Sequence, residues 1–569
     1  MNSNRRHFLN SAVLATTGIA MMPLWRDGGA IGARRVKATG IQDDPARNTT
    51  HRQALPPGRQ LFVDDFVVES ATLRRTFHKA VLHENNPVLK PETPLEMNFG
   101  YCPAACPFDD GVFYDPKDGL FKMWYLAGWF DGIAYATSED GVHWKRPSLD
   151  VEVGTNRVLA RRDRFQRDGS SVWLDSNASD PSERFKMFVF SRERTKDFVY
   201  GNFYNPDDPT MWRGGEIHTS HDGIHWSKPL LTGPCGDNTT FLYNSMRKKW
   251  FYSIRSENEQ FGRYRTFREC PDFVKGSAWS QQDLAFWAAA DDLDRPDPSL
   301  GYKPQLYKLS GVGYESLLLG MFGIFYGPSN PIAEKLRVPK TVDLQVGFSR
   351  DGINWHRPYR EAFIASSRVK GTWNRGYLQA ANGTCLIVKD KLHFYFGAFS
   401  GLSPKFGEHM YAGGSTGLAT LRRDGFASMD AGDSGGELIT RLIQFAGKYL
   451  FVNVDAAIGE LRIEILDEAG AVIPCYSFER CVPINSDSTS RLVRWKGGFD
   501  LSSLFGKSVS IRFHLRRGSL YSFWPSDDLA GASGGYVGAG GPGFTGPIDA
   551  VSPAGNVGCS SGAGNSGYT

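Results

Sequence analysis

The 569-residue sequence lacks a strong charge of either sign, because 65 lysines and arginines oppose 61 aspartates and glutamates and leave a net charge of +4. A chain this close to neutral has no basic surface for nucleic acid or for polybasic adhesion to a membrane. Apart from one modest apolar stretch near the N-terminus, the sequence lacks a long apolar run, and it has no long amphipathic helix. It contains no P-loop, dinucleotide fingerprint or His-Glu-x-x-His, so the enzyme classes that depend on these motifs are not expected.

Cysteine is scarce as well, with eight residues and no C-x-x-C pair. No histidine stands near them at ligand spacing, so no zinc site is expected. Cys102 with Cys106, and Cys475 with Cys481, are close enough to form disulfides in an oxidising compartment, and buried free thiols are the alternative. Three histidines between residues 218 and 225 are spaced like metal ligands, but strand alternation would turn neighbours to opposite faces. No metal site is therefore expected there.

The N-terminus resembles an export signal of the twin-arginine type. Arg5 and Arg6 precede a weakly apolar stretch from Ser11 to Leu24, which is too interrupted for a membrane span of about 20 strongly apolar residues. We expect residues 1–33 to be this signal and residues 34–60 to be a linker. The mature protein is then periplasmic or extracellular and has no membrane contact after signal removal. An uncleaved anchor or a disordered tail is the alternative.

The most informative feature that is present is an internal repeat. Three segments share Ser-x-Asp-Gly-x-x-Trp-x-x-Pro, at 138–147, 220–229 and 349–358, and two degenerate copies lie around Asp272 and Asp424. In such a segment Asp bonds back to nearby backbone amides, Gly takes a positive φ and Trp fills the gap beside the next strand. Each copy is therefore predicted to be a structural turn without a catalytic role.

Strand patterns precede these turns and predict the architecture of each repeat. A pair of strands such as residues 111–115 and 120–125 recurs, followed by a third strand before the turn. Each repeat is then a small antiparallel sheet of about four strands, which is the blade of a β-propeller. Five copies predict a five-bladed propeller over residues 61–434.

The pattern changes after the last repeat. Apolar and polar residues alternate over residues 449–454 and 509–515, which predicts a C-terminal β-sandwich over residues 435–528. Residues 529–569 are rich in glycine and poor in periodic hydrophobicity, so an irregular or flexible tail is expected. The predicted fold class is all-β, a five-bladed β-propeller followed by a C-terminal β-sandwich.

An exported chain of this architecture resembles the propeller glycoside hydrolases of families 32, 43 and 68. The resemblance rests on the residue pattern of the first blade, where Tyr114-Asp115-Pro116 leads into Phe121-Lys122-Met123-Trp124-Tyr125. It covers roughly residues 61–520. The family 32 signatures Trp-Met-Asn-Asp-Pro-Asn-Gly and Arg-Asp-Pro are absent. This departure puts a carry-over to fructan cleavage in doubt.

The resemblance implies three acidic residues in the central funnel of the propeller. One is a base or nucleophile in the first blade, one stabilises the transition state from the second blade, and one is a general acid further along the chain. Two carboxyl groups about 5–5.5 Å apart retain the anomeric configuration, and a separation of about 6.5–9.5 Å inverts it. The resemblance implies no organic cofactor and allows a structural Ca²⁺ in the propeller axis.

The candidate acids are chiefly those that begin the innermost strand of a blade. The candidates are Asp109, Asp110, Asp168, Asp237, Glu216 and Glu315. Glu315 stands beside Tyr314 and an apolar run, which could raise its pKa as a general acid requires. We assign Asp110 as base or nucleophile, Asp168 as orienting acid and Glu315 as general acid, with the others as substrate-binding or reserve groups. A turn-capping or salt-bridged acid is the alternative reading of each.

Basic and aromatic residues complete the predicted site. Arg255, Arg263 and Arg265 could meet an anionic sugar, a sulfate or a uronate, although they could equally pair with neighbouring acids. Trp129 and Tyr377 could stack on a sugar, with core packing as the alternative. The predicted function is an exported glycoside hydrolase acting on an extracellular or periplasmic glycan. The rival is a non-catalytic carbohydrate-binding or scaffold propeller, because propellers host many functions.

Overall fold

The computed structural model describes residues 53–160, 165–193 and 213–550. The predicted signal over 1–33 and residues 34–52 of the predicted linker lie outside these residues. The all-β prediction is confirmed, since strands dominate the chain and its α-helices are short. These helices are α1 (Pro94–Met97), α2 (Phe273–Gly276) and α3 (Asn330–Leu336). Among the described residues, no helix has the length and apolar character that a membrane crossing requires.

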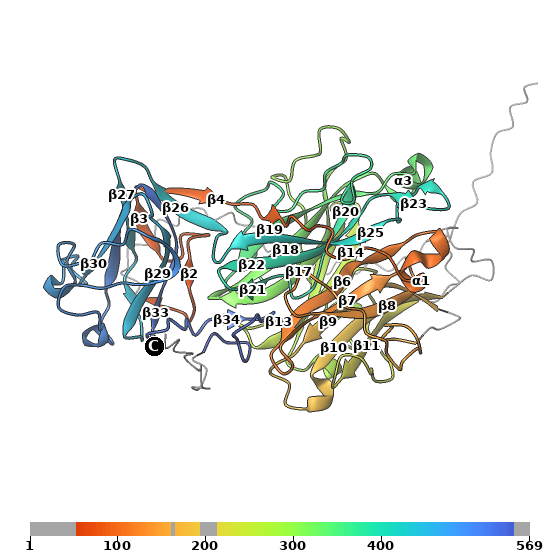
Figure 1. Cartoon of the computed structure of the whole chain (residues 1–569), viewed down its shortest axis with the longest axis horizontal. Helices are drawn as coiled ribbons and strands as arrows, with labels where there is room; N and C mark the ends of the chain where they lie inside the picture. The colour runs from red at the N-terminus through yellow and green to blue at the C-terminus, as the bar shows by residue number, and fades with distance from the viewer. Residues whose placement is uncertain (1–52, 161–164, 194–212, 551–569) are drawn as a thin grey trace, which may run out of the picture. The chain divides into compact units, whose positions relative to one another are not determined.

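The propeller consists of consecutive antiparallel meanders (Figure 1). The first holds β6 (Ala104–Asp115), β7 (Leu120–Ala127) and β8 (Gly132–Ser138). The second holds β9 (Phe165–Leu174), β10 (Phe185–Glu193), β11 (Arg213–Ser220) and β12 (Leu230–Leu231). The third holds β13 (Thr240–Asn244), β14 (Lys249–Asn258), β15 (Gly262–Cys270) and β16 (Ala285–Ala288).

Two further meanders follow in the chain. The fourth holds β17 (Gln305–Glu315), β18 (Leu317–Gly327) and β19 (Thr341–Ser349). The fifth holds β20 (Gly376–Ala380), β21 (Leu386–Val388), β22 (Lys391–Phe399) and β25 (Gly414–Arg422), with the small hairpin β23 (Leu402–Ser403) and β24 (Gly407–Glu408) before β25. Strand β25 runs parallel to the start of β6, so the first and last meanders share one sheet. Because that sheet is continuous, the count of five blades stays a prediction.

The ring is closed by contacts between the last and first meanders. The N-terminal strand β5 (Val81–Leu82) adds to β25 as an antiparallel neighbour. The Tyr395 hydroxyl on β22 donates to the Gly141 carbonyl at 2.6 Å, in the turn that ends the first meander. The same relation recurs around the ring, since Trp124 Nε1 donates to the Gly223 carbonyl at 2.7 Å. Each of these turns is thus held by an aromatic side chain of the preceding meander.

The repeat motif forms the turn that its sequence predicts. In the second copy Asp222 Oδ1 accepts from the amides of Ile224 and His225, each at 2.8 Å, and Ser220 Oγ accepts from the Gly223 amide at 2.9 Å. Gly223 has φ +81°, and a side chain there would collide with Trp124. The copies at 138–147 and 349–358 repeat the Asp and Ser bonds. The interpretation of these aspartates as structural is confirmed.

The C-terminal region forms two antiparallel sheets with an alternating core. The larger contains β31 (Asp487–Leu492), β29 (Tyr449–Asp455), β33 (Gly518–Ser526) and β26 (Ala427–Ala431). The smaller contains β27 (Gly436–Thr440), β32 (Ser510–Arg516) and β30 (Glu460–Leu466), while β28 (Ile443–Gln444) pairs with β1 (Gln53–Ala54). In β32 the side chains of Ile511, Phe513 and Leu515 are buried and alternate with more exposed ones. This is the period of two that predicts a sandwich.

The strand pairing corrects two predicted boundaries of the propeller. Strands β2 (Gln60–Leu61), β3 (Val68–Ala71) and β4 (Arg74–Phe77) fall inside the predicted propeller but pair with sandwich strands β33, β27 and β26 (Figure 1). Strand β26 also begins before the predicted sandwich limit at residue 435. Short apolar segments of this kind carry no local signal for the partner strand they join, which is why the sequence boundary was misplaced.

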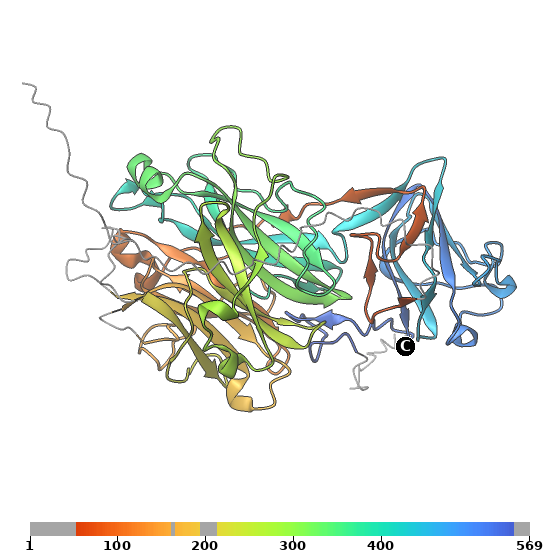
Figure 2. The same cartoon turned by 180° about the vertical axis from the view of Figure 1, so that it is seen from behind.

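The glycine-rich tail is packed against the propeller as far as it is described. Strand β34 (Tyr536–Val537) pairs with β17, as seen from behind in Figure 2. The Tyr114 amide donates to the Ala539 carbonyl and the Ile387 amide to the Gly540 carbonyl, both at 3.0 Å. A methyl group at Gly541 would overlap the Ile387 carbonyl oxygen. The predicted flexible tail is therefore bonded to three meanders over residues 536–541, and residues 551–569 lie outside the description.

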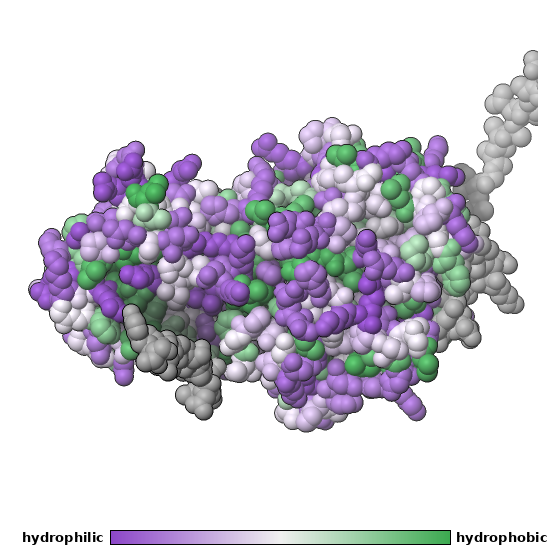
Figure 3. Space-filling model, in the orientation of Figure 1, coloured by the Kyte–Doolittle hydropathy of each residue, from purple (hydrophilic) through white to green (hydrophobic). Residues whose placement is uncertain are grey.

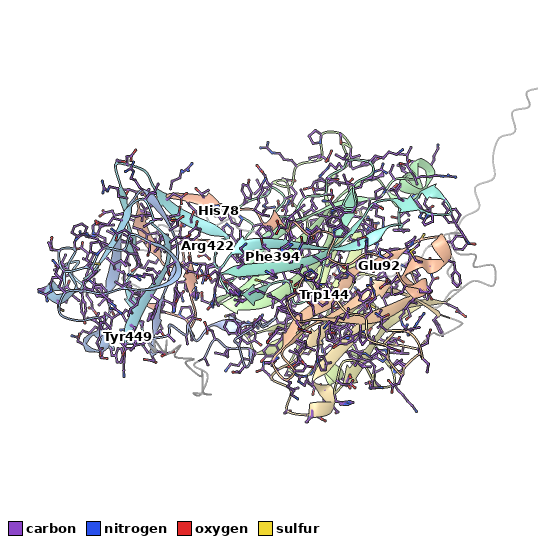
Figure 4. The ribbon with its side chains drawn as sticks, viewed as in Figure 1. His78, Glu92, Trp144, Phe394, Arg422 and Tyr449 are labelled. Carbon is purple, nitrogen blue, oxygen red and sulfur yellow. The ribbon has the colours of Figure 1, made fainter. Side chains whose placement is uncertain are left out.

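The apolar side chains of both regions face inward. The face shown in Figure 3 is largely hydrophilic and carries hydrophobic residues in small separate groups. Among the residues labelled in Figure 4, Phe394 packs edge-on against Phe363 at 5.0 Å between ring centroids. Arg422, at the end of β25, reaches the sandwich, where its Nε donates to Asn453 Oδ1 at 2.9 Å. All cysteines in the described ranges are free, including Cys102, Cys106, Cys475 and Cys481, so neither candidate disulfide is formed.

Candidate active site in the propeller funnel

The innermost strands of the meanders converge on one axis. Asn382, in the turn after β20, donates through Nδ2 to Ser171 Oγ at 2.9 Å and to the carbonyls of Val172 and Phe241 at 3.1 Å. One amide thus ties the fifth meander to the second and third. A Cβ atom at Gly111 would lie 2.8 Å from the Val172 carbonyl oxygen, so the inner strands touch backbone to backbone at this level. The inner strands therefore close the funnel at this level, which we call its floor.

Asp109 and Asp110 lie on the floor because strand β6 is bulged. Cys106 pairs with Leu126 and Gly111 with Trp124, so four residues of β6 oppose one of β7, and Asp109 adopts φ +77°. A non-glycine residue at positive φ is strained and is often found at functional positions. The bulge turns two consecutive carboxylates toward the axis.

Each floor carboxylate is fully buried and fully engaged. Asp109 lies 2.5 Å from Lys308 Nζ, and Ser310 Oγ donates to it at 3.3 Å. Asp110 accepts from Ser170 Oγ and from the Phe108 amide, the latter at 2.8 Å. Burial raises the pKa of both carboxyls to about 6, against the pull of Lys308. Because no edge of Asp110 is open, it is better suited to fixing β9 than to attacking a substrate.

A second pair of acids stands above the floor, joined by an arginine of β10. Arg192 contacts Asp168 through Nε and lies 3.0 Å from Asp237 Oδ2 through Nη2, so a single guanidinium bridges the pair. Asp168 is the fourth residue of β9, whereas Asp237 precedes β13. Two carboxylates that share one guanidinium are no further apart than about 8 Å, within the span of carboxyl pairs in glycoside hydrolases.

The environments of this pair push their pKa values in opposite directions. Burial raises the pKa of Asp168 despite the charge of Arg192. Burial opposes ionisation of Asp237 too, but Arg255 at 2.8 Å and Arg192 hold its pKa well below the usual range. Such a split is how one site obtains an acid and a base from two carboxyls. Asp237 is also the more open of the two, with 20% of its side chain exposed.

The rest of the funnel end is aromatic and cationic. Trp129 stacks on Tyr411 with ring centroids 4.1 Å apart and an interplanar angle of 10°, and Phe108 meets Trp129 and Tyr377 edge-on. On the other side, a hollow of about 340 Å³ on the third meander is lined by residues that include Arg255. Arg255, which pairs with Asp237, is therefore reachable from the surface.

The structure brings together Asp109, Asp110, Asp168, Asp237 and Arg255, as the register of the inner strands predicts. It does not bring Glu315 to them. Glu315 ends β17, seven residues beyond Lys308, and a strand of that length spans about 23 Å. Its Oε2 accepts from Ser533 Oγ at 2.6 Å and its Oε1 lies 3.1 Å from Arg423.

The assignment of Glu315 as general acid is therefore corrected. Burial does raise its pKa, but at the end of the propeller that the tail occupies. The apolar run after Glu315 is strand β18, so this residue ends an inner strand rather than beginning one. Glu216 is also not at the axis, because it lies on β11, the third strand of its meander, and contacts His218 at 3.5 Å.

Sequence reasoning missed Arg192, Lys308 and Lys340 at this site. Lys308 lies inside β17, which is buried along almost its whole length, so no alternation marks which side chains face the axis. The chain also contains one Glu-Cys pair, Glu269-Cys270, a family 32 signature. Glu269 lies at the far end of β15 and binds Arg247 at 2.7 Å, which places it outside this site.

Metal binding finds no support among the acids of the axis. In the described ranges, no three or more His, Cys, Asp and Glu side chains are placed to hold an ion. Asp109, Asp168 and Asp237 each contact a lysine or an arginine instead. These residues do not fit the structural Ca²⁺ that the resemblance allows in the axis.

The comparisons with known proteins find distant structural likenesses only. No protein-family model and no curated protein matches the chain. Among solved structures, a β-1,2-mannobiose phosphorylase from Listeria innocua aligns at 12% identity and TM-score 0.39, over 60% of this chain and 96% of its own. An N-acetylgalactosamine deacetylase from F. plautii aligns at 12% and 0.36, over 66% and 97%, and a GH43 protein from Bacillus licheniformis at 9% and 0.35, over 79% and 98%. Likenesses of this size assign no activity.

The class that the fold defines is an all-β propeller with an attached β-sandwich. Its distinguishing feature is a funnel end where four carboxyls, several cations and an aromatic wall meet around the axis.

Proposed function

We propose that the protein is an exported glycoside hydrolase that cleaves a glycan at the funnel end of the propeller. The observation that carries this proposal is the pair Asp168 and Asp237, bridged by Arg192, whose environments shift their pKa values in opposite directions. Glycoside cleavage needs one protonated and one ionised carboxyl on either side of the scissile bond.

The roles follow from the environment of each carboxyl. Asp168, whose pKa is raised by burial, acts as the general acid and donates a proton to the glycosidic oxygen as the C–O bond breaks. Asp237, held ionised by Arg255, attacks the anomeric carbon or takes a proton from the attacking water. Asp110 is a positioning residue, because it binds Ser170 and so fixes the strand that carries Asp168. The export signal over residues 1–33 and the periplasmic or extracellular location are part of this proposal.

The test is hydrolysis of a panel of plant and algal glycans and aryl glycosides, scored by release of reducing ends. Asp168→Asn and Asp237→Asn are each expected to lower turnover by about 10²–10⁴-fold, the usual range for a general acid or base. Asp433→Asn is the matched control, since Asp433 is an exposed acid of the sandwich. Activity that survives both funnel substitutions in folded protein would overturn the assignment.

A second candidate function is carbohydrate binding without cleavage. It is favoured by the fact that Asp109, Asp168 and Asp237 all contact cations, an arrangement that can also be purely structural. Retention of a glycan on the wild-type protein for hours without any product would support the binding function over hydrolysis.

A further inference from the structure

Three cations at the funnel end have no carboxylate partner. Lys340, Arg263 and Arg265 form no ion pair with any acid in the part of the chain that the structure describes, whereas Arg192, Arg255 and Lys308 all do. Lys340 and Arg265 are almost completely buried. A buried charge without a counter-charge is costly, so these groups are expected to have an anionic partner when the site is loaded.

All three cations contact one residue, Tyr307 of β17. Lys340 Nζ donates to the Tyr307 hydroxyl at 3.1 Å, and that hydroxyl lies 2.8 Å from the hydroxyl of Tyr377. The Arg263 guanidinium lies 5.4 Å from the centre of the Tyr307 ring, and Arg265 donates to the Tyr307 carbonyl. Lys340 and Arg263 hold the pKa of Tyr307 below its usual value, against the effect of burial. The local potential is therefore strongly positive.

The net charge of the side chains at the whole funnel end is also positive. Six cationic side chains gather there, and they are Arg192, Arg255, Arg263, Arg265, Lys308 and Lys340. Five carboxyls oppose them, namely the four acids near the axis and the exposed Glu257, which lies 2.6 Å from Arg255. Glu334 of α3 also lies near Lys340, but it is exposed and makes no ion pair with Lys340. A neutral sugar would leave this excess uncompensated.

We propose that Lys340 and Arg263, with the hydroxyls of Tyr307 and Tyr377, form a subsite for an oxyanion carried by the sugar, either a uronate carboxylate or a sulfate ester. The cations supply the charge and the tyrosine hydroxyls supply directed hydrogen bonds, which together suit an oxygen-rich anion. The subsite adjoins the Asp168 and Asp237 pair, since Arg265 donates both to the Tyr307 carbonyl and, at 2.7 Å, to the carbonyl of Asn238, the residue after Asp237. The proposal rests on the proposed function and names its substrate class.

Ligand-induced stabilisation tests this directly, because a ligand that binds only the folded protein raises its melting temperature. The protein is Asp168→Asn, so binding is read without cleavage. The probes are glucuronate, galacturonate and N-acetylglucosamine 6-sulfate, each against its neutral counterpart at matched ionic strength, together with inorganic phosphate alone. We expect the anionic sugars to raise the melting temperature and the neutral sugars to leave it unchanged.

The variants identify the residues. Lys340→Met keeps the aliphatic stem against the three tyrosine rings and is expected to weaken binding at least tenfold. Arg263→Gln, at a half-buried position, gives an independent reading should Lys340→Met fold poorly. The matched control is Lys303→Met, an exposed lysine nearby in sequence, which is expected to leave binding intact.

Each outcome of this experiment supports or overturns either the anion subsite or the hydrolase proposal. Equal shifts with neutral and anionic sugars, or shifts that survive both Lys340→Met and Arg263→Gln, would overturn the subsite. A shift with phosphate alone would replace the sugar-borne anion by a free one. If anionic sugars bind through Lys340 while wild type cleaves none of the panel, this subsite stands and the hydrolase proposal fails.

Discussion

Replacing Arg59 with Met is expected to destabilise the protein through the acids it leaves behind. Arg59 Nη1 lies 2.9 Å from Asp424 Oδ2, its Nε lies 3.5 Å from Glu315 Oε1, and its guanidinium covers Trp524 at 3.9 Å. Arg59, Asp424 and Glu315 are all buried. Met preserves the volume over Trp524 but removes the positive charge, so the substitution isolates the electrostatic contribution.

The magnitude follows from what remains around the two carboxyls. Removing one partner of a buried ion pair costs about 3–5 kcal/mol. Asp424 keeps the Tyr314 hydroxyl at 2.6 Å, and Glu315 keeps Arg423 at 3.1 Å, so the lower end of that range is expected. For roughly 500 cooperatively folded residues, about 3 kcal/mol corresponds to a fall of about 3 °C in melting temperature.

The assay is differential scanning calorimetry of wild type, Arg59→Met and Glu315→Gln at pH 7, with hydrolysis measured at 25 °C where all three are folded. If the double variant Arg59→Met/Glu315→Gln loses less stability than the sum of the two single variants, the side chains of Arg59 and Glu315 are directly coupled. A melting temperature unchanged in Arg59→Met would refute the reasoning. So would loss of hydrolysis in folded Glu315→Gln, because it would return Glu315 to a catalytic role.

Three further predictions concern other parts of the molecule. Because burial raises the pKa of Asp110 to about 6, the folded state holds a proton that the unfolded chain has released between about pH 4 and 6. The free energy of unfolding therefore falls as pH rises through this window. Asp110→Asn should reduce that fall by about 1–3 kcal/mol, measured by urea unfolding at a series of pH values. Parallel pH profiles of wild type and Asp110→Asn would contradict this prediction. Asp351→Ala removes the acceptor for the Ile353 and Asn354 amides and should cost about 1–2 kcal/mol, with a smaller loss in Asp351→Asn. Gly541→Ala should displace the tail and expose it to limited proteolysis, unlike Gly546→Ala, whose added methyl group meets open space.

The parts of the fold that were predictable are those with a local physical signature. The turn at Asp222 and Gly223 needs a backbone acceptor and a positive φ, and only certain residues supply them, so the repeat marks each meander. The sandwich follows from the period of two in β32. The proximity of Asp168 and Asp237 could be predicted because equivalent inner strands begin at equivalent positions; their catalytic role stays a prediction.

The parts that were not predictable depend on partners distant in sequence. Strands β17 and β18 are buried along almost their whole length, so no alternation marks the hairpin between them, and Glu315 was placed at the wrong end of the axis. Strands β2, β3 and β4 carry no signal for the sandwich they join. Lys340 lies between α3 and β19, and its position beside Tyr307 arises only when the fourth meander folds.

The two ends of the inner strands differ in how their charged side chains are paired. At one end the tail bonds to β6, β17 and β21, and Glu315 is enclosed by Arg59, Arg423 and Ser533. Each of these charged groups therefore has an opposite charge beside it at this end. At the other end the positive charge of Lys340 and Arg263 is unpaired, and Asp237 is accessible to solvent. Since uncompensated buried charge is retained in proteins chiefly where a ligand completes it, the glycan is expected to bind at the Asp237 end.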